Sequence, residues 1–202
     1  MIDLKKDCDW LALSPEQPIV DFECGDSDLN EFFNIDALKY QEQMLGQNYF
    51  FRHKITKKVV CAFSLSPDGL KTFDLPNNRR KKVRETIPRE KTLKSYPAYL
   101  IGRLGVETAF NGQGIGSQLI NIIKSFCFEQ FRNSCRFLLV DAYNKPEVLS
   151  FYQKNDFLFV FSSEEQERNY YQPNTTAPLH TRYMYYEMIH WKNKIYLQYD
   201  NG

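Results

Sequence analysis

The stretch YLIGRLGV at residues 99–106, followed by NGQGIGS at residues 111–117, decides the fold of this 202-residue chain. The first segment is an apolar strand, and the second places a glycine at every other position ahead of an amphipathic helix. A glycine turn at a helix N-terminus leaves backbone N–H groups unpaired, and the helix dipole favours negative charge there. The pattern therefore predicts a bound phosphate, and in particular a pyrophosphate.

Two common phosphate loops do not fit this spacing. A Walker loop needs a lysine after its last glycine, but Gly116 is followed by Ser117 and Gln118. A Rossmann fingerprint reads G-x-G-x-x-G within an early strand–helix–strand repeat, and GQGIG at residues 112–116 has the wrong last step. A plain glycine turn before a helix is the structural alternative.

The loop closely resembles motif A of the GNAT superfamily of N-acetyltransferases, which reads Gln/Arg-x-x-Gly-x-Gly/Ala. Asn111 stands at the Gln/Arg position, and Gly114 and Gly116 match the two glycines, where a Cβ would keep the backbone away from a pyrophosphate. The resemblance implies acetyl-coenzyme A (acetyl-CoA) as co-substrate. The residues that it implies for coenzyme binding are Leu104, Val106, Asn111, Gly112, Gln113, Gly114, Gly116, Ser117 and Asn144.

A second motif, FYQKNDF at residues 151–157, resembles the closing signature of the same superfamily. Asp156 replaces the glycine of the usual Gly-Phe turn, and Asp tolerates the left-handed conformation that such a turn needs. By the same resemblance, Asn144 would hold the pantetheine arm, and the backbone N–H groups of Leu104 and Val106 would polarise the thioester carbonyl.

Tyr152 is the catalytic residue that the resemblance implies. It would protonate the departing coenzyme thiolate, because its ordinary pKa of about 10 lies close to that of an alkyl thiol. The structural alternative is a core aromatic on an amphipathic helix. No general base is identified; Glu107 and Asp141, at the ends of two expected strands, are weak candidates. An α-amino group with a pKa of roughly 8 would need a base less than a lysine would.

A narrower resemblance covers most of residues 20–160. The segments FECGDSDLNEF at 22–32, FSLSP at 63–67 and LIGRLGV at 100–106 resemble the acetyltransferase toxins of bacterial toxin–antitoxin pairs. Those toxins acetylate the α-amino group of the amino acid on charged tRNA. The resemblance implies tRNA as a partner, and an antitoxin and a homodimer as further partners.

A basic segment at residues 79–94 fits a polyanionic partner. It holds eight basic and two acidic residues, a local charge of +6, which leaves −5 for the rest of a chain whose total is +1. Such a block is an electrostatic footprint for nucleic acid, although a solvated connecting loop is the common alternative. The residues expected to contact tRNA are Arg79, Arg80, Lys81, Lys82 and Arg84.

Two other functions remain open from the sequence. An acetyltransferase for small amines, such as a polyamine, an antibiotic or an amino acid, predicts an enclosed acidic acceptor pocket and no role for the basic segment. A non-catalytic module that binds acyl-CoA or nucleic acid predicts coenzyme binding without transfer, and no effect of Tyr152→Phe.

The composition indicates a cytoplasmic protein with ample apolar surface, since it includes 16 Phe and 13 Tyr. No apolar run is long enough to span a bilayer, and the opening residues do not form a signal peptide. The three histidines share no ligand spacing, so no metal site is expected. The cysteines have no C-x-x-C pair and are expected to be reduced; they are Cys8, Cys24, Cys61, Cys127 and Cys135.

The expected elements follow the order of the resembled family. That order implies an α/β fold with one mostly antiparallel sheet, splayed at the coenzyme site, and helices on both faces. We expect a single N-acetyltransferase domain over residues 1–202, with a basic insertion at about 76–96. The first helix should bury an apolar face from Leu29 to Met44 that includes Tyr40. The helix after the glycine loop should bury Ile115, Leu119, Ile120, Ile122, Ile123, Phe126 and Cys127.

The remaining segments are assigned by their patterns. Residues 49–54 and 59–66 should form a β-hairpin, and residues 67–97 a polar connection with room for a short helix. Strands are expected at 137–140, 157–161 and 182–188. We expect a polar loop at 164–178 and an edge strand at 194–199.

Overall fold

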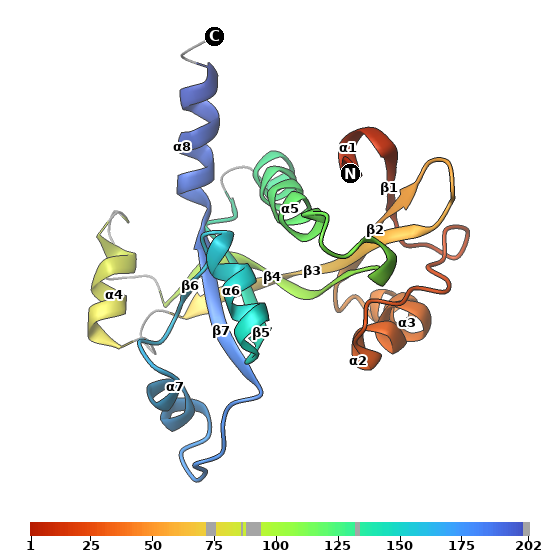
Figure 1. Cartoon of the computed structure of the whole chain (residues 1–202). Helices are drawn as coiled ribbons and strands as arrows, with labels where there is room; N and C mark the ends of the chain where they lie inside the picture. Colours follow the sequence, from red (N-terminus) through yellow and green to blue (C-terminus); the bar gives the residue numbers. More distant parts are fainter. Residues whose placement is uncertain (72–75, 86, 88–93, 132–133, 200–202) are drawn as a thin grey trace. The chain divides into compact units, whose positions relative to one another are not determined.

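The computed structural model describes residues 1–71, 76–85, 87, 94–131 and 134–199 (Figure 1). Seven strands form one mixed sheet in the order β1-β2-β3-β4-β5-β7-β6. Among the strand pairings described, β4·β5 is parallel and the others are antiparallel. The α/β fold class predicted from the sequence is therefore confirmed. The chain divides into two compact units, which we call unit 1 (Met1–Pro67 with Ile101–Ser125) and unit 2 (Asp68–Leu100 with Phe126–Gly202).

Unit 1 contains the hairpin and the first helices. Helix α1 (Leu4–Asp7) leads into β1 (Cys8–Ala12), which pairs with β2 (Gln47–His53), and β2 pairs with β3 (Val59–Lys71). Between β1 and β2 lie α2 (Ser27–Glu31), a π-helical turn (Phe32–Asp36) and α3 (Ala37–Glu42). The second part of β4 (Ser95–Val106), a 3₁₀ turn (Thr108–Phe110) and most of α5 (Ile115–Phe131) complete the unit.

The first helical segment is only partly as predicted. The Asp26 side chain caps α2 by accepting from the Leu29 N–H at 3.2 Å, and Phe32, Phe33 and Ala37 are buried as expected. Tyr40 and Met44 are 44% and 93% exposed, so their prediction as core residues is wrong. The π-helical turn shifts the helical face, and α3 ends at Glu42, before Met44, which has a left-handed φ of +59°.

Unit 2 contains the rest of the sheet, several helices and the last part of α5 (Figure 1). Strand β5 (Phe137–Tyr143) pairs along its whole length with β7 (Thr181–Glu187), and the short β6 (Leu158–Phe159) pairs with the other edge of β7. The helices are α4 (Asn77–Arg84), α6 (Pro146–Lys154), α7 (Glu164–Tyr171), α8 (Met188–Tyr199) and the last residues of α5.

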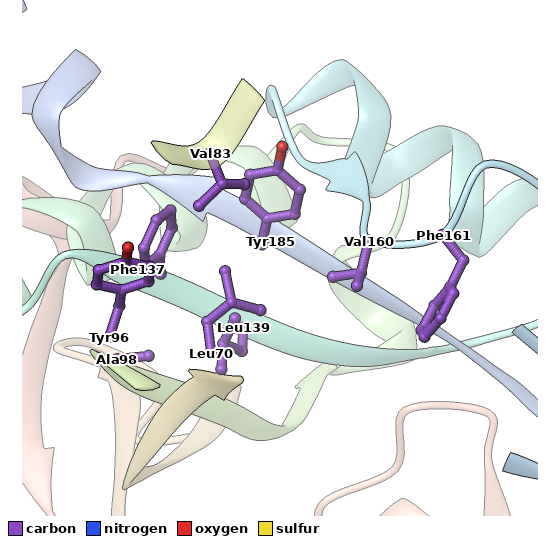
Figure 2. Close-up of a cluster of buried hydrophobic side chains, with 9 residues drawn as sticks. All are labelled: Leu70, Val83, Tyr96, Ala98, Phe137, Leu139, Val160, Phe161 and Tyr185. Atoms are coloured by element: carbon purple, nitrogen blue, oxygen red, sulfur yellow. The ribbon is translucent and has the colours of Figure 1, made fainter. Parts of the chain in front are cut away.

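Aromatic and branched side chains from several of these elements form the core of unit 2 (Figure 2). Val83 of α4 is fully buried in this cluster, beside side chains from β3, β4, β5 and β7. Burying a valine side chain contributes roughly 1.5–3 kcal/mol, so Val83 anchors an otherwise polar helix. The cluster consists of Leu70, Val83, Tyr96, Ala98, Phe137, Leu139, Val160, Phe161 and Tyr185.

The structure corrects several expected elements of unit 2. Residues 164–171 form α7 instead of a loop, because the Ser163 hydroxyl accepts from the Gln166 N–H at 3.1 Å and acidic residues occupy the first turn. Residues 194–199 continue α8 instead of forming an edge strand. Strand β3 extends to Lys71 and β4 begins at Ser95, whereas β6 is limited to two residues. The short helix allowed for within 67–97 is α4.

Helix α5 has the predicted buried face, apart from the half-buried Phe126. In the described part of the chain, no helix has the length and apolar character needed to cross a membrane. The described residues also contain no cluster of His, Cys, Asp and Glu that could hold a metal ion.

Candidate active site

The glycine loop before α5 lies in unit 1, and two of its glycines adopt a left-handed backbone conformation. Gly112 has a φ of +75° and Gly114 a φ of +73°, in the left-handed region that glycine favours. A Cβ built on either residue would meet no heavy atom within 4 Å. The backbone of this loop therefore borders open space, as it must if it is to approach an external anion closely.

Helix α5 begins directly after this loop. The Gln118 N–H donates to the Gly114 carbonyl at 3.1 Å, so the amides of residues 115–117 precede the first helical bond and lie at the positive end of the dipole. Asn111 and Ser117 are exposed, and Gln113 and Gly116 are half-buried. This geometry fits the diphosphate of a coenzyme.

The side chain of Gln118, for which no role was predicted, fixes the start of α5 to the N-terminal segment. The Gln118 amide donates to the Ile2 carbonyl at 2.9 Å and accepts from the Leu4 N–H at 3.0 Å. Ile115 and Leu4 are buried. The helix end that follows the glycine loop is therefore held rigidly within unit 1.

The direction of the β4 backbone groups follows from one hydrogen bond. The Glu107 N–H donates to the Val60 carbonyl of β3 at 2.9 Å. Because successive N–H groups of an extended strand alternate between its two edges, those of Leu104 and Val106 point away from β3. The described ladder between β4 and β5 contains Ala98–Leu100 only, so it ends before Leu104.

The close approach around Gly105 explains why this strand contains a glycine there. A Cβ on Gly105 would lie 3.1 Å from two atoms of the Phe22 ring and 3.2 Å from the Cys24 sulfur. Phe22 is itself buried against Phe33, with ring centroids 5.5 Å apart. Gly105 thus lets the segment around Phe22 and Cys24 pack directly on β4.

Tyr152 lies on α6 in unit 2 and is 6% exposed. Its ring packs edge-on against Phe151 and Phe157, with centroids 5.0 and 5.4 Å away. Burial raises the pKa of Tyr152 above its ordinary value, since an ionised phenolate would lose its hydration. The phenol therefore keeps its proton at neutral pH, which is the state required of a proton donor.

The turn after α6 is closed as the motif predicts. Asp156 has a φ of +67°, so an aspartate does occupy the left-handed position usually taken by glycine. The Phe157 N–H donates to the Tyr152 carbonyl at 3.0 Å, and the Asp156 N–H donates to the Gln153 carbonyl at 3.0 Å. These bonds fix the end of the helix that carries Tyr152.

Asn144 follows β5 and has a structural role of its own. Its side-chain amide donates to the Leu179 carbonyl at 3.0 Å and hydrogen-bonds the Glu164 carboxylate, which helps to lower the pKa of Glu164. Its backbone N–H donates to the His180 carbonyl at 2.9 Å. These bonds connect the end of β5 to the segment before β7.

The two weak candidates for a general base differ in their surroundings. Glu107 accepts from the Glu23 N–H at 2.9 Å and from the Thr108 hydroxyl at 3.2 Å, so its carboxylate joins two chain segments. The pKa of Asp141 is raised, chiefly by desolvation and then by the nearby carboxylate of Asp68. Glu107 is thus occupied in holding the structure of unit 1.

The basic segment forms α4 over its first part. Lys81 and Lys82 are exposed, whereas Arg80 and Arg84 are half-buried around the buried Val83. The Nε of Arg84 is buried and has no hydrogen-bond partner among the described residues. The side chain of Arg79 and residues 88–93 lie outside the described part of the chain.

A cavity of about 540 Å³ in unit 1 was not predicted from the sequence. Arg103 of β4 lies over the Phe32 ring at 4.9 Å on its wall. The cavity is lined by Asp28, Glu31, Phe32, Asp36, Lys39, Tyr40, Gln43, Leu45 and Arg103.

Similar solved structures share this fold over nearly the whole chain. A tyrosine-to-phenylalanine mutant of KacT has a TM-score of 0.70 at 15% identity, covering 93% of this chain and 99% of that chain. AtaT complexed with acetyl-methionyl-tRNAfMet has a TM-score of 0.69 at 17% identity, covering 94% and 99%. AtaTR bound with AcCoA has a TM-score of 0.69 at 18% identity, covering 94% and 98%.

The family comparison covers the glycine loop, β4 and the FYQKNDF motif together. The model of the "Acetyltransferase (GNAT) family" matches residues 28–157, which is more than half of the sequence. The chain belongs to the GNAT acetyltransferase family.

Proposed function

We propose that this acetyltransferase transfers the acetyl group of acetyl-CoA to the α-amino group of an aminoacyl-tRNA. The observation that carries the acceptor is α4, a helix anchored by buried Val83 that exposes Lys81 and Lys82 to solvent. Exposed cations on an anchored helix suit a phosphate backbone. The structure of AtaT with acetyl-methionyl-tRNAfMet, which shares the fold, supports the same acceptor.

In this proposal, unit 1 supplies the coenzyme-binding groups. The loop from Asn111 to Ser117, with Gly112, Gln113, Gly114 and Gly116, receives the pyrophosphate at the start of α5. The N–H groups of Leu104 and Val106 point away from β3, where they can donate to the pantetheine arm and to the thioester oxygen. Asn144 is assigned to the pantetheine arm by the family resemblance alone.

The chemical step needs one donor and one acceptor of protons. The amine nitrogen attacks the thioester carbonyl, the C–N bond forms, and the C–S bond breaks as charge on the carbonyl oxygen collapses. We assign Tyr152 as the group that gives its proton to the departing thiolate. The amine must lose a proton to reach the neutral amide, and an α-amino group with a pKa of about 8 can lose it to water.

A small cationic amine is the second candidate acceptor, because the 540 Å³ cavity of unit 1 contains three carboxylates. Asp28, Glu31 and Asp36 lie on its wall, against the cations Lys39 and Arg103. Lys39 is 3.2 Å from Asp36 and neutralises it in part. The net charge of the lining is −1, which favours a cation weakly.

The deciding experiment measures transfer of labelled acetyl groups from acetyl-CoA to a charged tRNA pool, to uncharged tRNA and to spermidine. We expect label on charged tRNA alone, with Tyr152→Phe inactive and Lys81→Ala/Lys82→Ala reduced at least tenfold in kcat/KM for tRNA. The double variant Lys5→Ala/Lys6→Ala removes two exposed lysines of unit 1 and is the matched control. Label on spermidine alone would overturn the tRNA proposal in favour of the second candidate.

Partners other than the substrates remain predictions. AtaT has been solved with the C-terminus of the antitoxin AtaR, and KacTA with DNA. By analogy we expect an antitoxin and a homodimer for this chain. Co-purification with the product of an adjacent gene and analytical ultracentrifugation would check the two expectations separately.

A further inference from the structure

A second cavity, of about 190 Å³, lies in unit 2 and has no role in the function proposed above. Its walls come from the end of β3, the segment after β6, helix α7 and β7. Six of the lining residues form what we call the aromatic cage: Asp68, Lys71, Phe161, Tyr170, Tyr171 and Tyr183.

The Tyr171 ring of the cage stands steeply to two others, at 87° to Tyr170 and 72° to Phe161, whereas Phe161 and Tyr170 are inclined by 37°. Tyr170 and Tyr171 are 4.9 Å apart at an interplanar angle of 87°, and Phe161 lies 5.4 and 5.7 Å from them. Phe161 is buried at the end of the core cluster opposite Val83 (Figure 2). Tyr170 and Tyr171 are 44% and 54% exposed, so they form the outer part of the wall. Rings inclined to one another in this way offer π faces of different orientation to a single guest.

A carboxylate, Asp68, lies next to these rings and forms no ion pair with a described residue. Asp68 accepts from the Gly69 N–H at 2.6 Å, and no Lys or Arg among the described residues forms an ion pair with Asp68 or Asp141. The two carboxylates are near enough for Asp68 to raise the pKa of Asp141. Both also raise the pKa of the half-buried Tyr183 phenol, after the larger effect of desolvation.

The cation that precedes Tyr183 in β7, Arg182, already has a buried partner. Arg182 donates from its Nε to Glu167 at 2.7 Å in a buried ion pair, and its guanidinium lies over the Phe159 ring at 4.6 Å. The other Glu167 oxygen accepts from the Tyr183 N–H at 2.6 Å. Helix α7, which supplies Tyr170 and Tyr171, is thereby fixed to β7, and Arg182 cannot neutralise Asp68.

We propose that the aromatic cage binds an organic cation, an alkylammonium or guanidinium group, between its aromatic rings and the Asp68 carboxylate. Electron-rich ring faces and a carboxylate that forms no ion pair within the described part of the chain both attract such a group, and a neutral group would gain neither interaction. Cavities that hold whole ligands measure about 300–1,000 Å³, so 190 Å³ suits one headgroup or side chain. The exposed Lys71 at the cavity wall competes for the same carboxylate.

The test measures binding of n-butylammonium and butylguanidinium by titration calorimetry and by amide chemical shifts, with neutral butan-1-ol as the isosteric probe for butylammonium. We expect both cations to bind at least tenfold more tightly than the alcohol. Asp68→Asn and Tyr171→Ala should each weaken cation binding at least tenfold, and Lys71→Met should strengthen it. Asp9→Asn, which removes an exposed carboxylate of unit 1, is the matched control and should change nothing.

Two further binding measurements show whether the cation belongs to a protein side chain or to a free amine. Tighter binding of the peptides Gly-Arg-Gly or Gly-Lys-Gly than of butylammonium would indicate a side chain of a protein partner, whereas tighter binding of agmatine would indicate a free amine. Tyr171→Phe keeps the ring and should retain binding, which separates loss of the cage from loss of the fold. Equal affinity for cation and alcohol, or full binding by Asp68→Asn, would overturn the proposal. Tyr152→Phe should bind the cations normally, so this result is independent of the acetyl-transfer assay.

Discussion

At the scale of single residues, Gly114 and Gly25 have the same left-handed backbone conformation but differ in the atoms that surround them. Their φ angles are +73° and +85°. A Cβ on Gly25 would lie 3.7 Å from the Thr108 methyl, an ordinary contact, and one on Gly114 would project into open space. Alanine at either position should therefore cost a similar backbone strain of about 1–2 kcal/mol.

The two substitutions should differ in coenzyme binding. Gly114→Ala places a methyl group where the proposed pyrophosphate approaches, so we expect its KM for acetyl-CoA to rise at least tenfold. Gly25→Ala should lose as much stability in urea denaturation but keep its KM. An unchanged KM in Gly114→Ala, at equal loss of stability, would contradict the assignment of this loop.

A second prediction at the residue scale concerns the proton that Tyr152 donates. Tyr152→Phe should lower kcat about 10²–10⁴-fold, the usual contribution of a general acid, with little change in Tm. Burial raises the pKa of Tyr152, and the active form is protonated, so its activity is lost only as pH rises through that raised value. The rate of acetyl transfer measured from pH 6 to 9.5 should therefore show no alkaline decline that depends on Tyr152. A decline below pH 9 that Tyr152→Phe abolishes would contradict this assignment.

At the scale of elements, one buried ion pair fixes α7 to β7. Arg182 and Glu167 are 8% and 2% exposed, whereas the Lys39–Asp36 pair lies on the surface. Glu167→Gln leaves the Arg182 charge buried without its counter-ion and should cost about 3–5 kcal/mol of unfolding free energy. Asp36→Asn should cost less than about 1 kcal/mol. Urea denaturation of the two variants measures the difference, and equal values would show that α7 is held by other contacts.

Prediction from the sequence succeeded for several elements and failed for α7. The glycine loop, α5 and the α6 turn carry strong local signals, because positive φ angles and helical periodicity demand particular residues at particular positions. The start of α7 carried a comparable signal that was missed: Ser163 caps the Gln166 N–H, and the Gln166 side chain accepts from the Ser162 N–H at 3.1 Å. Its composition is polar, so periodicity alone suggested a loop.

Other features were beyond sequence reasoning because they depend on tertiary packing. Residues 194–199, predicted as an edge strand, belong to α8, where Phe128 of α5 packs edge-on against Tyr196 with ring centroids 6.4 Å apart. The aromatic cage joins residues from four separate segments between Asp68 and Tyr183. No local pattern could place those side chains around one cavity.

At the scale of the whole molecule, the distribution of charge along the chain should determine tRNA binding more than the net charge does. A net charge of +1 gives the chain no general attraction for nucleic acid, and the basic segment carries +6 against −5 elsewhere. Binding of tRNA should then depend on a few cations in one segment. Non-specific association by the remaining surface should be weak.

The salt dependence of tRNA binding tests that distribution. Each lysine that contacts a phosphate contributes roughly 0.7–0.9 to the slope of log K against log salt concentration. Lys81→Ala/Lys82→Ala should therefore reduce the slope by about 1.5, measured by fluorescence anisotropy between 50 and 300 mM salt. Lys5→Ala/Lys6→Ala changes the net charge by the same amount and should leave the slope unchanged. An equal reduction in both variants would mean that total charge governs binding, and α4 would lose its assignment as the tRNA contact.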